Sequence, residues 1–295
     1  MKEITDNDIH PRLRVPWKSA EDEFVPDFNT KVDPDLLAQY QHEVDTYEAA
    51  NPTSKKIKHI PHIKLDLPLL DYKKAWQEVN TIPKEKFAYC NLRNVIETKE
   101  KGPLYHPHWC GLSTVNYTPY SWTGQGKQAK EEATLQYPEF QPRATKLINE
   151  KQLESEDMEF YHTEIYDQLP TIGNFIKDHI ADRTYRVNVW KIHAGGYLNW
   201  HNHARLPWHT GLTLNDKAIV HIPLYTHPDV KMLVKKEGKI YSERYNHGES
   251  WLFNYIYDHA VDNPSDVFRC HIVLYVPLTD KKFCALVERS LDAMQ

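Results

Sequence analysis

The spacing of apolar residues divides the chain into a helical first half and a strand-rich second half. After Asp33-Pro34, where an N-cap residue precedes a proline, four apolar positions share one helical face until Asn51-Pro52: Leu37, Tyr40, Val44 and Tyr47. The pattern predicts a helix here. Further helices are expected at 71–79, near 144–153 and along the apolar stripe from Leu169 to Ile180, with strands at 86–98 and 112–122.

From residue 185 the apolar period changes to two, which indicates strands that are buried on one face. Eight short strands are predicted, separated by turns: 185–192, 196–201, 217–225, 230–236, 239–244, 249–255, 258–262 and 267–277. Eight strands with short turns favour a jelly roll. The sequence therefore predicts a mainly β protein whose barrel is covered by N-terminal helices.

These patterns suggest four segments along the chain. Residues 1–60 form an N-terminal arm and helix, 61–184 are helices and strands that flank the barrel, 185–280 are the barrel, and 281–295 are a C-terminal tail. The first 32 residues are polar and interrupted by prolines, so we expect them to lie on the surface as an arm rather than to fold as a unit.

Charge and composition narrow the classes of partner. The net charge is −5, and the longest basic cluster, Lys55 to Lys58, is too short to follow a phosphate backbone, so nucleic acid is not expected to bind. The sequence has neither a membrane-spanning apolar run nor the apolar stretch of a signal peptide at its start, which favours a soluble cytoplasmic protein with a small-molecule substrate. Its four separated cysteines indicate reduced thiols.

Histidines concentrate in the predicted barrel, which holds nine of the 17. Gly195-Gly196 is followed by a short strand and two histidines, His201 and His203, and residues two apart on a strand point the same way. His259 stands before a later strand, and Arg269 follows it by ten residues. Imidazoles on facing strands would hold Fe(II) and leave positions open for an organic ligand and O₂.

The motif from Gly248 to Asn254 (Gly-Glu-x-Trp-x-Phe-Asn), then His259 and Arg269-x-His271-x-Val, resembles the aspartyl/asparaginyl β-hydroxylase group of Fe(II)/2-oxoglutarate oxygenases and the related bacterial free-proline hydroxylases. Gly195-x5-His201 is similar to the family's approach to its first metal ligand. The likeness covers about residues 185–278. It implies a double-stranded β-helix, a cupin-like form of the jelly roll.

Carried over residue by residue, the resemblance implies roles for five side chains. His201 and His259 would bind iron, and Arg269 would pair with the distal carboxylate of 2-oxoglutarate, a role that suits a guanidinium because it binds a carboxylate through two parallel hydrogen bonds. His221 and His271 would add hydrogen bonds to this cosubstrate. The substrate-facing candidates are His203, Trp208 and Trp200.

Two alternatives concern the metal ligands. His203 stands where many relatives have an acidic ligand, so it either ligates iron or faces the substrate, and we favour the second. His209-Thr210-Gly211 also resembles the first-ligand motif and lies 12 residues before His221, but the glycine turn favours His201. Ile219 occupies a place where the family has arginine.

The resulting hypothesis is an Fe(II)/2-oxoglutarate-dependent dioxygenase that hydroxylates a C–H bond of an amino acid or a similar metabolite. The alternative is a cupin-type dioxygenase or isomerase with three histidine ligands and no 2-oxoglutarate, because Gly195-x5-His201-x-His203 also fits a cupin motif. A barrel that binds a ligand without turnover is a third possibility. The sequence does not predict an oligomeric state.

Overall fold

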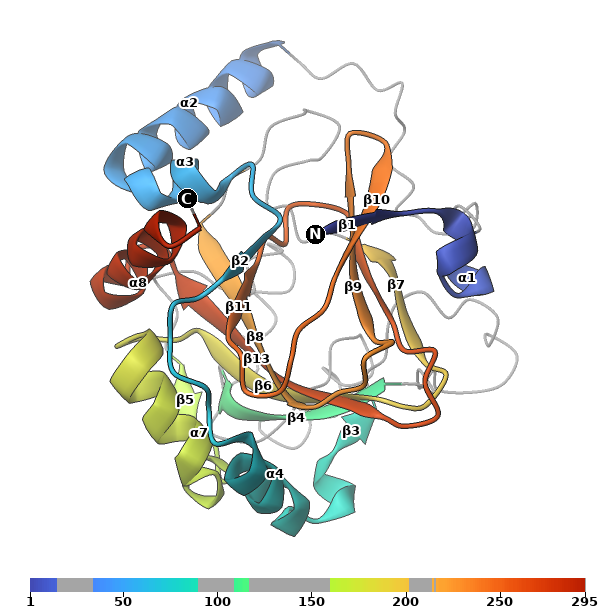
Figure 1. The fold of residues 1–295 in the computed structure, drawn as a ribbon. Coiled ribbons are helices and arrows are strands. Elements are labelled where there is room, and N and C mark those ends of the chain that lie inside the picture. The colour runs from blue at the N-terminus through green and yellow to red at the C-terminus, as the bar shows by residue number, and fades with distance from the viewer. Residues whose placement is uncertain (15–33, 90–108, 117–159, 202–213, 215, 295) are drawn as a thin grey trace.

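The computed structural model describes residues 1–14, 34–89, 109–116, 160–201, 214 and 216–294 (Figure 1). Its strands form two antiparallel sheets. The smaller sheet has the order β1 (Lys2–Ile4), β10 (Lys239–Glu243), β9 (Lys231–Lys236), β12 (His259–Asp262) and β7 (Tyr197–His201). The larger has the order β2 (His62–Lys64), β11 (Trp251–Phe253), β8 (Lys217–Tyr225), β13 (Arg269–Pro277), β6 (Arg186–Ile192), β4 (Trp109–Asn116) and β3 (Ala88–Tyr89), and β5 (Tyr161–His162) pairs with β4.

The strand order identifies the barrel topology. Counted from β6 to β13, the first, eighth, third and sixth strands adjoin one another in the larger sheet, and the second, seventh, fourth and fifth adjoin one another in the smaller. Apart from the fourth and fifth, consecutive strands thus alternate between the two sheets, as in a double-stranded β-helix or jelly roll. The predicted fold class is confirmed, and each of the eight predicted strands starts and ends within two residues of the observed bounds.

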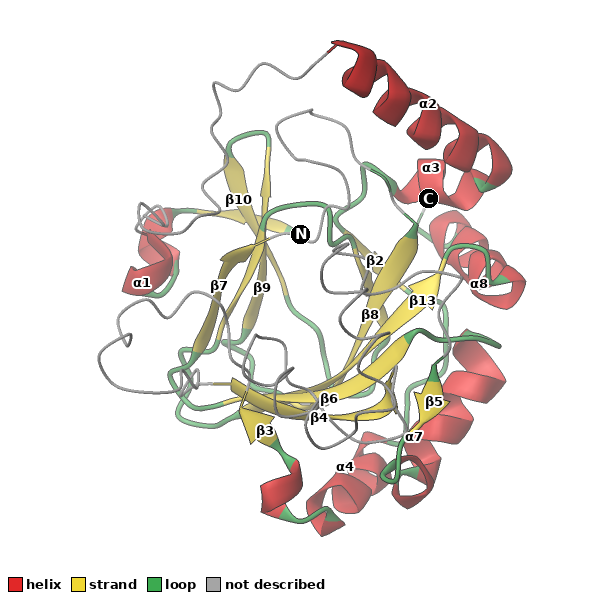
Figure 2. Ribbon diagram, turned by 180° about the vertical axis from the view of Figure 1, so that it is seen from behind, coloured by secondary structure: helices red, strands yellow, loops and turns green. Residues whose placement is uncertain are grey.

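Helices cover the outer face of the larger sheet (Figures 1 and 2). The α-helices are α1 (Pro11–Arg14), α2 (Pro34–Ala50), α3 (Pro52–Ile57), α4 (Tyr72–Thr81), α7 (Pro170–Phe175) and α8 (Lys281–Asp292). Single turns η1 (Asp6–Asp8), η2 (Lys84–Lys86) and η5 (Tyr166–Gln168) and the π-helical η6 (Ile176–Ile180) complete them. Side chains of α3, α4, α7, η6 and α8 form one apolar core with the outward residues of β8 and β13.

Both ends of the chain pack against the rest of the protein where the structure describes them. The N-terminal arm is structured where it is described: β1 pairs with β10, and Ile9 and Leu13 are buried against Trp200. The C-terminal tail is the helix α8, whose Phe283 and Val287 are fully buried. Alternating polar residues conceal the arm's few anchors in the sequence, and so short a terminal segment gives only a weak helical period.

The other helix predictions agree with the structure for α2, α4 and the stripe that becomes α7 and η6. The strand expected at 86–98 is described only at β3, and the one at 112–122 overlaps the longer β4. The helix expected near 144–153 lies outside the described residues. Within the described part of the chain, no helix combines the length and apolarity that a membrane crossing requires.

Candidate active site

Polar side chains stand on the inner face of the larger sheet, where a packed barrel would carry apolar ones. The alternation of β13 places Arg269, His271, Val273 and Tyr275 on one face, and the last two belong to the interior cluster formed with residues of β9, β11 and β12. In the adjoining strand β8, His221 pairs with Val273. The interior therefore holds a guanidinium and several imidazoles at exposures of 9% or less.

Arg269 is the charged centre of this interior. It is 2% exposed, and its Nη2 lies 2.7 Å from His271 Nδ1 and 3.5 Å from Met232 Sδ. Burial lowers the pKa of Arg269 to about 9, so the guanidinium remains charged at neutral pH. Among the described residues no carboxylate pairs with it, and its Nε has no hydrogen-bond partner. Such a cation requires an anion.

The contact with Arg269 determines the tautomer of His271. A guanidinium only donates hydrogen bonds, so Nδ1 of His271 accepts and the ring proton resides on Nε2. Burial and the neighbouring Arg269 charge lower the pKa of His271 well below its usual range, so the ring is neutral. Nε2 is buried without a partner among the described residues. Arg269 and His271 thus present adjacent N–H donors suited to a carboxylate.

His259 has the geometry of a metal ligand. It is 5% exposed, and its Nδ1 lies 2.8 Å from the Tyr257 carbonyl oxygen. Since a carbonyl only accepts, Nδ1 carries the proton and Nε2 carries the lone pair that a metal requires. Strand β12 also pairs His259 directly with position His201 of β7. The topology thus brings the two predicted ligands side by side on neighbouring strands.

Strand β9 relates this histidine to Arg269. Val234 pairs with His259, whereas Met232, two residues earlier, contacts the guanidinium. Two residues of a strand span about 7 Å, which is the length scale of a short dicarboxylate. The imidazole tautomer of His259 fits a divalent metal, and the buried Arg269 fits the distal carboxylate of 2-oxoglutarate. The residues present therefore suit both groups.

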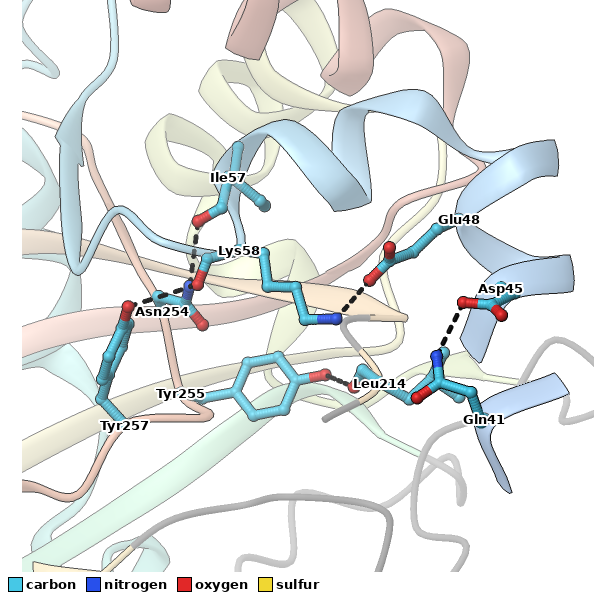
Figure 3. Close-up of polar contacts among 9 residues, drawn as sticks. All are labelled: Gln41, Asp45, Glu48, Ile57, Lys58, Leu214, Asn254, Tyr255 and Tyr257. Atoms are coloured by element: carbon cyan, nitrogen blue, oxygen red, sulfur yellow. Dashed lines mark hydrogen bonds and ion pairs between the residues drawn. The ribbon is translucent and has the colours of Figure 1, made fainter. Parts of the chain in front are cut away.

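The N-terminal half of the chain holds the turn that leads to His259 (Figure 3). Asn254 Nδ2 donates hydrogen bonds to the carbonyls of Ile57 and Lys58 at 3.0 and 3.1 Å, and the Tyr257 hydroxyl donates to Lys58 at 3.4 Å. The carbonyl of the same Tyr257 accepts from His259. Segment 57–58, at the end of α3, therefore positions the candidate ligand through two residues of the β11–β12 turn.

Gly248 and Glu249, which begin the motif that resembles the family, hold the barrel against the segment around β2. Gly248 has φ +74°, and a Cβ there would lie 2.7 Å from the Leu70 carbonyl oxygen. Burial alone would raise the pKa of Glu249, but hydrogen bonds from Lys64 Nζ, Trp251 Nε1 and Asn246 lower it to about 2. Both residues therefore fix the segment around β2 against the barrel.

A cluster of aromatic side chains contacts the buried histidines of the site. Tyr245 stacks on Trp251 at 4.8 Å and lies 6.3 Å from His271 and 6.1 Å from His221, measured between ring centroids. Its hydroxyl is 2.5 Å from His62 Nδ1. The sequence analysis missed His62 and Tyr245. In the sequence, each is only a histidine or an aromatic residue near the edge of a strand, and many unrelated positions share that feature.

The other predicted site residues have different outcomes. His203, Trp208 and His209 lie outside the described residues, so their roles stay predictions. Trp200 does not fit its expected role at the substrate, because its Nε1 donates to the Leu13 carbonyl at 2.9 Å and its ring packs on the N-terminal arm. Among the described side chains, no three His, Cys, Asp or Glu residues gather as a metal-binding group.

Comparisons with known proteins give distant structural likenesses. No model of a protein family and no curated protein matches the sequence. The solved structures include an oxidoreductase of the 2OG-Fe(II) oxygenase family from Burkholderia pseudomallei, 7% identical, with 78% of this chain and 90% of that one covered and a TM-score of 0.39. A cupin domain from Bordetella pertussis Tohama I is 21% identical over 31% of this chain and 79% of its own, with a TM-score of 0.23. With such scores, the fold assignment rests on the strand order described above.

Proposed function

We propose that the chain is an Fe(II)/2-oxoglutarate-dependent dioxygenase that hydroxylates an unactivated C–H bond of a small molecule, an amino acid or an amino-acid-like metabolite. The observation that carries this proposal is Arg269, a buried guanidinium beside His271 with no carboxylate partner among the described residues. A binding barrel without an anionic ligand would have no use for so costly a charge.

Each residue has one task in this proposal. His259 and His201 would hold the metal, and His203 would face the substrate rather than ligate the metal. Arg269 binds the distal carboxylate of 2-oxoglutarate, and the Nε2–H of His271 and the imidazole of His221 add hydrogen bonds. When bound, Fe(II) and 2-oxoglutarate supply the oxidising chemistry, in which one atom of O₂ enters the hydroxylated product, the other enters succinate, and CO₂ leaves.

The chain itself contributes orientation and exclusion of water. The Tyr257 carbonyl fixes the ring orientation of His259, and the bond from Arg269 fixes that of His271. Exposures of 5%, 2% and 1% for His259, Arg269 and His271 place these donors away from bulk solvent. Hydrogen bonds and charge pairs to a bound dicarboxylate are stronger there than at the surface.

The test uses the purified protein reconstituted with Fe(II) under anaerobic conditions. Adding 2-oxoglutarate should produce the weak visible charge-transfer band of a chelated complex, and exposure to O₂ with a panel of amino acids and metabolites should yield succinate for at least one compound. The control is Arg269→Met under the same conditions, which should give neither signal. Absence of the band and of succinate in the wild-type protein would overturn the proposal and favour a three-histidine cupin.

A further inference from the structure

A second polar pair lies in the barrel interior and includes a residue from outside the eight core strands. His62 belongs to β2, which extends the larger sheet beside β11 and pairs His62 with Phe253. Its Nδ1 is 2.5 Å from the Tyr245 hydroxyl, and the two residues are 4% and 2% exposed. The pair is therefore part of the same buried polar interior as His271 and His221.

The hydrogen bond between these residues indicates which proton the imidazole carries. Burial raises the pKa of Tyr245 well above 10, so the phenol keeps its proton, and burial lowers the pKa of His62 to about 3, so the ring is neutral. If the hydroxyl donates to Nδ1, both atoms are satisfied and the ring proton lies on Nε2. The reverse assignment would leave the phenol proton buried without an acceptor among the described residues, so the first is favoured.

This assignment leaves one N–H donor of the pair, at His62 Nε2, without an acceptor among the described residues. Nε2 lies at the tip of the imidazole, farther from the backbone than Nδ1, and it has no hydrogen-bond partner among the residues that the structure describes. Buried polar atoms of native proteins are nearly always hydrogen-bonded. The Nε2–H of His62 therefore indicates an acceptor that a bound molecule supplies.

The neighbours of His62 distinguish this donor from the pair that faces the cosubstrate's distal carboxylate. The Phe253 ring lies 5.4 Å from the His62 ring and 4.6 Å from the His259 ring, between centroids. Across the sheet, Phe253 pairs with Ile219 and Ile219 with Tyr275, toward the end of β13 opposite to Arg269. His62 and the candidate metal ligand His259 therefore flank the same Phe253 ring, and His62 lies three strands across the larger sheet from Arg269.

We propose that the Nε2–H of His62 binds a carbonyl or carboxylate oxygen of the substrate, with Tyr245 as the residue that fixes its tautomer. The role of the bound molecule as substrate rests on the proposed function. The donor chemistry does not, since it follows from the buried pair itself. A neutral N–H donates to amide and carboxylate oxygens alike, whereas an ammonium group has no lone pair to accept from it.

The experiment uses the whole protein with ¹⁵N-labelled histidine, loaded with Zn(II) and saturated with 2-oxoglutarate so that Arg269 is occupied. The Nε2–H signal of His62 is assigned from its loss in His62→Gln. Acetate and acetamide are then titrated separately, with ethylammonium as a matched probe that lacks an acceptor oxygen. Saturable shifts of this signal with acetate, acetamide or both are expected, and none with ethylammonium. If acetate binds more strongly than acetamide, the substrate group is a carboxylate; if acetamide binds more strongly, it is a carbonyl.

Variants test the same contact by affinity. His62→Leu should weaken binding of the responding probe about 5-fold, the effect of one neutral hydrogen bond, whereas His62→Gln, which keeps an N–H donor, should retain most of it. In Tyr245→Phe the His62 signal should show a mixture of tautomers. Because the titration itself is made on the wild-type protein, an unfolded His62→Leu does not prevent the test.

Two results would overturn the inference. One is a His62 signal that responds to neither acetate nor acetamide. The other is a shift caused by 2-oxoglutarate alone with no further response, which would assign the donor to the cosubstrate. Failure of the proposed function is seen separately, as absence of Zn(II) or 2-oxoglutarate binding before either probe is added.

Discussion

Replacing Arg269 by methionine should stabilise the ligand-free protein while it abolishes binding of 2-oxoglutarate. The lowering of the arginine pKa from 12.5 to about 9 corresponds to about 5 kcal/mol of unfavourable free energy in the charged form, to the order of magnitude. Methionine removes this cost, but it leaves Nδ1 of His271 without its donor, a loss of about 1 to 3 kcal/mol. We therefore expect the free energy of unfolding at pH 7 to rise by about 2 to 4 kcal/mol.

The assay is urea unfolding of the metal-free wild type and variant, repeated with Mn(II) and 2-oxoglutarate. A ligand at 100 times its Kd stabilises the native state by about 2.7 kcal/mol, and the variant should lose this increment. Arg269→Lys is the matched control, because it keeps the charge without the planar fork and should weaken 2-oxoglutarate binding with little effect on the metal.

The pH dependence provides an internal check. Because the native pKa of Arg269 is the lower one, the unfolded chain binds more protons between pH 9 and 12.5. The stability of the wild type relative to Arg269→Met should therefore rise as pH increases above 9. A variant that is destabilised by more than about 1 kcal/mol at pH 7, or that keeps the increment from 2-oxoglutarate, would refute the reasoning about an unpaired buried cation.

Three other predictions test the remaining parts of the site. His201→Ala and His259→Ala should each lose stoichiometric Mn(II) binding by calorimetry while His203→Ala keeps a stoichiometry near one; if His209→Ala alone empties the site, the first ligand was misassigned. Gly248→Ala should lower the free energy of unfolding by about 1 to 3 kcal/mol, because its Cβ meets the Leu70 carbonyl at a positive φ; an unchanged urea midpoint would contradict this. The low pKa of Glu249 stabilises the native state above pH 4.5, and this contribution is lost as pH falls toward 2. In Glu249→Gln, the free energy of unfolding should therefore decrease less between pH 4.5 and 2 than it does in the wild type. An equal decrease in both proteins would exclude the Lys64 and Trp251 contacts as its cause.

The barrel was predictable because its signal is local. Apolar residues alternate with polar ones within each strand, and turn residues separate the strands. The order of β6 to β13 then follows from one known topology. Even the spacing from His259 to Arg269 has a local cause, since β12, a short turn and the start of β13 separate them. Both residues, which the sequence singled out, are buried in the structure.

The part contributed by the N-terminal half was not predictable in the same way. Strand β2 has three residues, too few for periodicity to register, and its pairing of His62 with Phe253 joins positions 191 residues apart. Nor does the motif at Gly248 and Glu249 reveal from sequence that it holds residues Leu70 and Lys64. Long-range pairings of this kind leave no pattern within a single segment, so only the folded chain shows them.

The two faces of the larger sheet divide stability and chemistry between them. Outward residues of β13 such as Ile272 and Leu274 are fully buried in the apolar core with α4, α7 and α8. Inward residues of the same strand include Arg269 and His271, whose polar atoms cost free energy until a ligand satisfies them. Because residues alternate along a strand, one short segment carries both sets. The helices on the outer face thus supply the apolar burial that lets the barrel keep an interior of imidazoles and a guanidinium.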